Sequence, residues 1–278
     1  MRLVKQLVAV AAVAFVGSRV VAGVGGNPWL TLAAGVATAI AAILVYAWVV
    51  RRTERRAPTE IARSGAATRT AWGGLIGVAM FVAVIVTIAS LGGYQVHGLG
   101  SVTGAVALIG FMAAAAVTEE LIFRGVLFRI VEERTGTWIA LLLTGVVFGL
   151  AHLPNPDAGL WGATAIAIEA GFMLAACYVA TRNLWLPIGL HFGWNFAAGG
   201  IFGTAVSGTG QPDGLLDATT SGPALLTGGA FGPEGSLYAV AAGAILTVVF
   251  LWLAHRRGHI VARRRRAVGV GPVATVTR

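Results

Sequence analysis

Residues 113–124 read Ala-Ala-Ala-Ala-Val-Thr-Glu-Glu-Leu-Ile-Phe-Arg, an apolar helical run that ends in two adjacent acids and an arginine. An ionised side chain at the centre of a bilayer costs about 2.5–3.5 kcal/mol, so three within six residues would not be kept for packing alone. Glu120 and Arg124 are four residues apart in the favourable order for an ion pair on one helix face. The helical repeat turns Glu119 about 100° away. We therefore predict that Arg124 neutralises Glu120 while Glu119 points to another group.

The composition around this stretch is that of an integral membrane protein. The chain has 278 residues, of which 57% are hydrophobic and 11% charged, whereas soluble domains carry about 25% charge. The net charge of +9 comes from bases beside apolar runs, without a nucleic-acid-binding motif or a basic groove with aromatic residues. We expect no nucleic-acid partner. Cys177 is the only cysteine, which excludes an intramolecular disulfide.

Apolar periodicity and length predict an all-α, multi-pass transmembrane helical bundle of about eight spans in the cell membrane. The first span contains Lys5 and Arg19 and has a signal peptide as its alternative interpretation. A span is favoured there, because several more follow and no clear small-residue cleavage site is present. The predicted spans are residues 3–24, 28–50, 72–91, 101–134, 138–152, 160–181, 184–202 and 236–254.

The positive charge lies at one end of this predicted bundle. The N-terminus, the loop 51–69, Arg182 and the tail share that end, while the opposite loops contain no Lys or Arg. The positive-inside rule therefore predicts cytoplasmic N- and C-termini. The tail run Arg263–Arg266 is expected to fix this orientation and to attract anionic lipid headgroups.

Further polar residues interrupt two later spans. Phe148-Gly-Leu-Ala-His152 places a histidine at the end of the fifth span, and His191-Phe-Gly-Trp-Asn195 places His and Asn on one face of the seventh. Counted from the basic end, helical rise places Glu119 and His152 about 21–22 Å deep, and the seventh-span pair about 10–17 Å deep. The sequence thus allows these side chains to converge.

Such a group suits hydrolysis of a peptide bond. A carboxylate and an imidazole around one water can take its proton and return it to a leaving amine. Nearby His and Asn donors can stabilise a tetrahedral oxyanion. Alternatively, Glu119, His152 and His191 bind one zinc-like divalent ion with a water in the open position. The residues alone leave both interpretations open.

The three motifs, in this order and on separate spans, resemble those of the CPBP family of CAAX-prenyl-protease-like and bacteriocin-processing (Abi-like) intramembrane proteases. The resemblance covers residues 101–198 and rests on Glu119-Glu120-x-x-x-Arg124, Phe148-x-x-x-His152 and His191-x-x-x-Asn195, with flanks Phe123-Arg124-Gly125 and Leu184-Trp185-Leu186-Pro187-Ile188. It implies that Glu119 and His152 activate the water, that Glu120 and Arg124 brace the site, and that His191 and Asn195 support the oxyanion. The implied substrate is a membrane protein or lipidated peptide; family members are called metalloproteases, and the sequence does not decide whether a metal is required.

This resemblance divides the chain into residues 1–100, with the first three spans, a core at 101–203, and residues 204–278, with a loop, the last span and the basic tail. Two other functions compete with the protease. One is a proton-coupled transporter that relays protons through Glu119, Glu169 and the histidines. The other is a non-catalytic immunity or interaction protein on the same scaffold. Glu169 has no assigned role: it pairs with Arg19 or lines the cavity.

Overall fold

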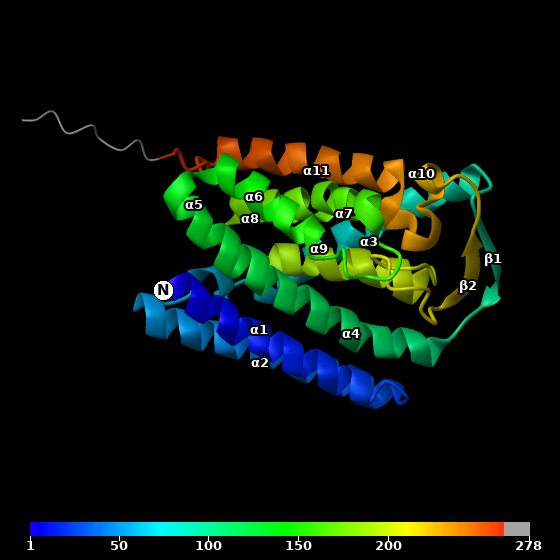
Figure 1. Ribbon diagram of the computed structural model, residues 1–278, viewed down its shortest axis with the longest axis horizontal. Coiled ribbons are helices and arrows are strands. Elements are labelled where there is room, and N and C mark those ends of the chain that lie inside the picture. Colours follow the sequence, from blue (N-terminus) through cyan, green and yellow to red (C-terminus); the bar gives the residue numbers. More distant parts are fainter. Residues whose placement is uncertain (264–278) are drawn as a thin grey trace, which may run out of the picture.

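The computed structural model describes residues 1–263 and is mostly helical (Figure 1). Of the predicted lipid-attracting run, residues 264–266 lie outside the described part of the chain. The α-helices are α1 (Arg2–Gly23), α2 (Pro28–Glu54), α3 (Ala66–Ser90), α4 (Val102–Glu120), α5 (Arg129–Thr135), α6 (Thr137–Leu150), α7 (Gly159–Ile166), α8 (Met173–Thr181), α9 (Trp185–Asn195), α10 (Ala224–Thr227) and α11 (Leu237–Arg256). Three π-helical segments continue α-helices: η2 (Leu121–Phe128), η3 (Ala167–Phe172) and η4 (Phe196–Ile201). Three short 3-10 turns complete the helical elements: η1 (Thr59–Ile61), η5 (Gly229–Phe231) and η6 (Pro233–Gly235).

Within residues 1–263, six helical segments are long and apolar enough to cross a membrane, and the chain is a multi-pass membrane protein, as predicted. They are Arg2–Gly23, Pro28–Glu54, Ala66–Ser90, Val102–Thr135, Gly159–Thr181 and Leu237–Arg256. The fourth joins α4, η2 and α5 into the single long helix expected from the sequence. The predicted count of eight spans also needs α6 and α9 with η4, which are shorter, so that count stays a prediction.

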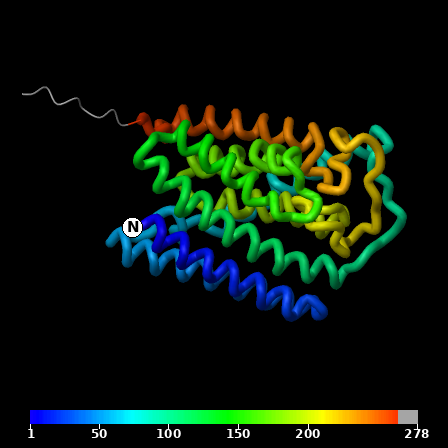
Figure 2. Tube along the Cα trace, viewed as in Figure 1, coloured from blue at the N-terminus to red at the C-terminus, as the bar shows by residue number. Residues whose placement is uncertain are grey.

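Both ends of the described chain lie at one end of the bundle (Figure 1). Arg2 forms an ion pair with Glu133, and the Val261 backbone N–H donates to the Thr137 hydroxyl at 2.8 Å. Figure 2 shows α1 and α2 together along the flank of the bundle next to α4. We call this end, which holds Arg2, Arg56, Arg129, Arg182 and Arg257, the basic end.

The opposite end carries a small sheet that the all-α prediction left out. Strands β1 (Tyr94–Leu99) and β2 (Leu216–Thr220) pair antiparallel, with a bulge between Val96 and Gly98. Both strands lie in Gly-rich loops and are too short for a period-two pattern to stand out, so the pairing depends on tertiary contacts. Tyr94 secures the sheet to the bundle by donating its hydroxyl to the Phe202 carbonyl at 2.9 Å. We call this end, with the loop 202–236, the sheet end.

A seam of glycines fixes α9 against α3. A Cβ added at Gly73 would lie 2.2 Å from the Leu186 carbonyl oxygen, and one added at Gly193 would lie 2.3 Å from the Gly74 oxygen. Small residues spaced four apart allow two membrane helices to bring their backbones together. Any side chain at these positions would force the helices apart. The seam therefore sets the position of α9, the helix that carries His191 and Asn195.

At the basic end, buried acids and arginines form closed ion pairs. Arg129 donates to both carboxylate oxygens of Glu54 at 2.8 and 2.9 Å, and Arg56 donates to both oxygens of Glu60 at 2.8 and 2.9 Å. Tyr46 also donates to Glu60 and, at 3.0 Å, to the Gly125 carbonyl. Bidentate pairs of this kind satisfy each oxygen of the acid. We call these residues, Tyr46, Glu54, Arg56, Glu60 and Arg129, the basic-end cluster.

Candidate active site

Polar residues of the first and third motifs lie at or beside the π-helical segments. Glu120 ends α4 and is followed by η2, which contains Arg124. Asn195 ends α9 immediately before η4. Segments with π geometry appear frequently at functional sites, because they shift side chains out of the regular helical register. The π-helical segments could not be predicted, because α-helical spacing rules do not describe them.

Arg124 is fully enclosed and its charge is satisfied locally. Its Nη1 donates to Glu120 Oε1 at 2.6 Å, as the i,i+4 spacing predicted. Its Nη2 donates to the carbonyls of Ala170 and Gly171 in η3, at 2.9 and 3.1 Å. The guanidinium also lies 4.4 Å from the centroid of the Phe148 ring, a cation–π contact. Arg124 thus ties α4 to η3 and to the phenylalanine of the second motif.

Glu120 has a second partner that helix spacing could not reveal. The same Oε1 lies 3.0 Å from His191 Nδ1. An ionised carboxylate accepts only, so His191 carries a proton on Nδ1 and directs Nε2 away from Glu120. Phe148 separates this group from the core, with its ring 6.1 Å from His191 and 4.9 Å from His152. Glu120 therefore connects Arg124 to the imidazole of the third motif.

His152 reaches the site from the turn after α6. Its Nδ1 lies 2.8 Å from the Phe148 carbonyl oxygen. A carbonyl cannot donate, so Nδ1 carries the proton and Nε2 is the free nitrogen. That Nε2 lies 4.0 Å from Glu119 Oε2. The backbone of its own motif thus fixes the tautomer of His152.

Glu119 faces both histidines and pairs with no arginine among the described residues. Its Oε2 lies 3.9 Å from His191 Nε2 and 4.0 Å from His152 Nε2, and this buried oxygen has no hydrogen-bond partner. Two atoms at this separation can both contact one water at hydrogen-bond lengths of about 2.8 Å, with an angle of about 90° at the water. The three atoms therefore surround a space suited to one water molecule.

A cavity of about 300 Å³ adjoins this group. Glu119, His152 and Asn195 line it together with residues of the loop 204–235. Asn195 is buried and belongs to the cavity wall. The structure thus brings Glu119, His152, His191 and Asn195 to one place, with Glu120 and Arg124 directly behind them. The catalytic roles assigned to these six residues stay predictions.

The donor set resembles a zinc site in chemistry but not in spacing. Two imidazole nitrogens and a carboxylate, with each imidazole Nδ1 held by an oxygen, match the outer hydrogen bonds of zinc-binding histidines. Bonds of about 2.1 Å in a tetrahedral site would place the ligand atoms about 3.4 Å apart, whereas these lie 3.9 and 4.0 Å apart. Within residues 1–263, no group of three or more His, Cys, Asp or Glu is arranged to hold a metal ion. As arranged, the residues do not fit the expected ion.

Glu169 has neither of the partners that the sequence suggested. It lies in η3, is buried and forms no ion pair within the described chain, while Arg19 is exposed on α1. Its backbone packs against α11, since a Cβ added at Gly243 would lie 2.3 Å from the Glu169 Cα. The predicted pairing with Arg19 is therefore wrong. Glu169 is also absent from the wall of the active-site cavity.

Sequence reasoning missed Glu234, a buried acid close to the site, because it lies in a Gly-rich loop without an apolar pattern around it. Glu234 accepts from Trp194 Nε1 at 2.7 Å and from the backbone and hydroxyl of Ser207. Burial raises the pKa of Glu234, although these hydrogen bonds oppose the shift. Trp194 precedes Asn195, and Ser207 lines the cavity. Glu234 therefore fastens the loop to the helix of the third motif.

Comparisons with known proteins agree with this arrangement of motifs. Residues 101–197 match the family model described as "Type II CAAX prenyl endopeptidase Rce1-like". A Bacillus subtilis (strain 168) protein named "Putative membrane peptidase YdiL" is 33% identical over 79 residues, which are 28% of this chain and 30% of that protein. The chain thus matches less than a third of the length of this curated relative. No solved structure matches the chain.

Proposed function

We infer from the membership of residues 101–197 in the Rce1-like family of type II CAAX prenyl endopeptidases that this chain is an intramembrane endopeptidase. The proposed reaction is hydrolysis of a peptide bond in a membrane protein or lipidated peptide. One observation carries the proposal: a carboxylate oxygen without a partner faces two imidazole nitrogens at 3.9 and 4.0 Å beside a cavity. Unlike Glu120, which is paired with Arg124, Glu119 has no arginine partner among the described residues and is free to bind a water.

The formal charges of the buried site favour the binding of one additional proton, which would make the site neutral. Glu119, Glu120 and Arg124 together carry a charge of −1, and a proton on His191 would make the group neutral. His191 is the suitable carrier, because its Nδ1–H already donates to the Glu120 carboxylate at 3.0 Å. A single water would then accept from His191 Nε2–H and donate to Glu119 Oε2 and His152 Nε2. The unpartnered Glu119 Oε2 and the Nε2 atoms of both histidines would then be hydrogen-bonded.

The proposed chemistry follows from this water. Glu119 removes one of its protons as the water oxygen attacks the carbonyl carbon of the substrate. The resulting oxyanion accepts hydrogen bonds from His191 Nε2–H and from the Asn195 amide. When the C–N bond breaks, the proton returns from Glu119, or through His152, to the leaving amine. Glu120 and Arg124 hold His191 in the orientation that this step needs.

The zinc-like ion stays a prediction, and no step of this mechanism passes through it. When bound by Glu119, His152 and His191, a divalent ion would polarise the water in place of the extra proton. Elemental analysis of purified protein separates the two cases, because the ion requires about one equivalent of metal per chain.

We also propose the orientation in the membrane. Eight spans, with α6 and α9–η4 as the two short ones, place both termini on one side. The positive-inside rule makes the basic end cytoplasmic. The tail run Arg263–Arg266 then faces the cytoplasmic leaflet, where anionic headgroups would attract it.

The proposal is tested by comparing protein termini in membranes of cells that make either the wild-type chain or the variant Glu119→Gln. We expect a set of new termini in membrane proteins that is present with the wild type and lost in the variant. The variant Glu60→Gln, altered at the basic-end cluster, is the matched control and should retain the set. Identical termini with wild type and Glu119→Gln would contradict the peptidase proposal and favour the non-catalytic scaffold.

A further inference from the structure

The active-site cavity extends from Glu119 mainly along one direction of α4, and a second pocket of about 360 Å³ borders Glu119 from the side, between α4 and residues of α1 and α2. Along α4 its wall is formed by Phe111, Met112 and Ala115, which lie between Glu119 and the start of the helix at the sheet end. From the other elements, the wall is formed by residues at or near the sheet end: Ala151, His152, Asn155, Asn195, Val206, Ser207 and Thr209. Phe123 is the one lining residue of α4–η2 on the other side of Glu119. The cavity therefore leads from Glu119 toward the sheet end.

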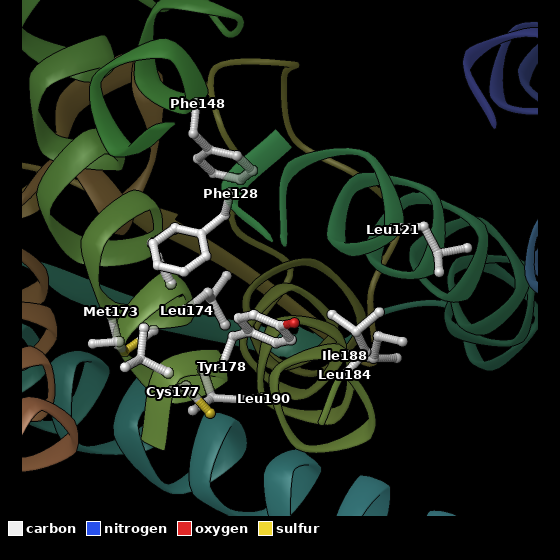
Figure 3. Close-up of a cluster of buried hydrophobic side chains, with 14 of the residues drawn as sticks. Leu121, Phe128, Phe148, Met173, Leu174, Cys177, Tyr178, Leu184, Ile188 and Leu190 are labelled. Carbon is white, nitrogen blue, oxygen red and sulfur yellow. The ribbon is translucent and has the colours of Figure 1, made fainter. Parts of the chain in front are cut away.

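Toward the basic end, the site is closed by packed side chains. Phe148, Leu121 and Phe128 are completely or almost completely buried, and Arg124 is enclosed beside them. Figure 3 shows Phe128 and Phe148 within the cluster of buried hydrophobic side chains that fills this part of the bundle. Beyond it lies the basic-end cluster with its paired charges. A polypeptide cannot reach Glu119 from that end without breaking this core.

Hydrogen bonds hold the rim of the cavity in place at the sheet end. Asn155 Nδ2 donates to the Ser207 carbonyl at 2.7 Å, and the Asp157 backbone N–H donates to the Gly208 carbonyl at 3.1 Å. Glu234 holds the same loop from the other side through Ser207 and Trp194. Thr209 is exposed at this rim. The loop therefore frames an opening of the cavity at the sheet end.

The charges assign this opening to a side of the membrane. The segments 91–101, 151–158 and 202–236, which form the sheet end, contain no Lys or Arg, while Arg19 lies near the end of α1 that is opposite the basic end. The bases of the described loops gather at the basic end. By the positive-inside rule, the sheet end is the extracytoplasmic one.

We infer that the active-site cavity opens on the extracytoplasmic face, so that this peptidase cleaves segments of membrane or exported proteins presented from outside the cytoplasm. This inference rests on the proposed peptidase function for its substrate class. It separates this chain from a peptidase that takes a prenylated CAAX segment from the cytoplasm, because a cytoplasmic segment would meet the closed side of the site.

Cysteine labelling tests the direction of the opening without any need for catalysis. In a Cys177→Ala background, Ala115→Cys introduces a thiol into the cavity wall and Ser207→Cys introduces a second one at its rim. Ala116→Cys, next to Ala115 but fully buried, is the matched control, and Ser64→Cys, exposed in the loop at the basic end, reports the opposite face. Each variant is treated with a membrane-impermeant, charged thiol reagent in right-side-out spheroplasts and in inverted vesicles.

We expect Ala115→Cys and Ser207→Cys to be labelled in spheroplasts and to lose labelling in inverted vesicles, and Ser64→Cys to show the reverse. Ala116→Cys should remain unlabelled in both. Labelling of the cavity thiols only in inverted vesicles, or in neither preparation, would overturn the inference. If Ala115→Cys does not accumulate, Ser207→Cys decides by the same criteria.

The termini lost in the Glu119→Gln variant supply the second measurement. They should map to extracytoplasmic portions of their proteins. Termini on the cytoplasmic portions would overturn the extracytoplasmic assignment while leaving the peptidase proposal intact. Conversely, unchanged termini would contradict the peptidase proposal, whereas outside labelling of Ala115→Cys would still establish the direction of the opening.

Discussion

Two regions of this molecule bury acids inside a membrane bundle, and they treat them in opposite ways. In the basic-end cluster, Glu54 and Glu60 each receive two hydrogen bonds from an arginine. In the active site, Glu120 receives one hydrogen bond from Arg124 through Oε1, and its Oε2 has no partner, whereas Glu119 faces only imidazole nitrogens at 3.9 and 4.0 Å. Of these four acids, Glu119 is the one without an arginine partner among the described residues, and it borders a cavity.

The largest effect should come from Glu119→Gln, which removes the proposed base and leaves the surrounding pairs intact. We expect peptidase activity to fall by roughly 10²–10⁴-fold. The midpoint of thermal unfolding should stay the same or rise, since an amide costs less to bury than an unpartnered carboxylate. Activity is measured on a peptide that spans a cleavage site identified from the termini, with Glu60→Gln as the control that keeps activity. Equal activity of Glu119→Gln and wild type would remove Glu119 from the mechanism.

Arg124→Ala should reduce both stability and activity. It strands the Glu120 carboxylate in the core, at a cost of about 3–5 kcal/mol, and it loosens His191, which Glu120 orients. The double variant Glu120→Gln with Arg124→Met removes both charges and should recover much of the lost stability without recovering activity. Thermal unfolding of the purified variants gives the first quantity and peptide cleavage the second. A double variant that regains activity would show that the pair does not position His191.

Arg129→Met should affect stability alone. Loss of the bidentate ion pair with Glu54 removes two hydrogen bonds to a charged group, each worth about 1.5–3 kcal/mol at most. Because the Arg129 side chain lies at the basic end of the bundle, water reduces part of the electrostatic energy that is lost. The expected result is a lower unfolding midpoint with an unchanged turnover number for the folded fraction. A reduced turnover number at unchanged stability would mean that the two regions are not separate in function.

The smallest effect is a pH dependence at the basic-end cluster. Burial tends to raise the pKa of Glu60, but hydrogen bonds from Arg56 and Tyr46 outweigh it and hold this pKa below the ordinary value of 4.5. Stability from Glu60 is therefore fully present above the unfolded pKa and is lost as the pH falls through the folded one. Wild-type unfolding midpoints should fall below about pH 4.5 more steeply than those of Glu60→Gln. If the unfolding midpoints of wild type and Glu60→Gln changed in parallel with pH, the proposed contribution of ionised Glu60 to stability would be refuted.

The sequence anticipated local features better than distant contacts. The Glu120–Arg124 pair lies within one helical turn, so spacing was sufficient to predict it. The bond from His191 to Glu120 joins positions 71 residues apart and depends on how α9 is placed, which no helical period encodes. The spacing within the predicted span 101–134 likewise gave no indication that Arg129 would pair with Glu54 of another helix. Glu234 gave no signal, because a single acid in a Gly-rich loop is usually exposed.

The direct backbone contact between α3 and α9 restricts how the enzyme could admit a substrate. With Gly73, Gly77, Gly189 and Gly193 already at closest approach, α9 has no slack on that side and acts as a fixed wall. Any widening that makes room for an extended peptide has to come from the remaining walls, which are α4, the turn after α6 and the loop fastened by Glu234. Substitutions that hold this loop more firmly should slow entry of the peptide while leaving the chemical step unaltered.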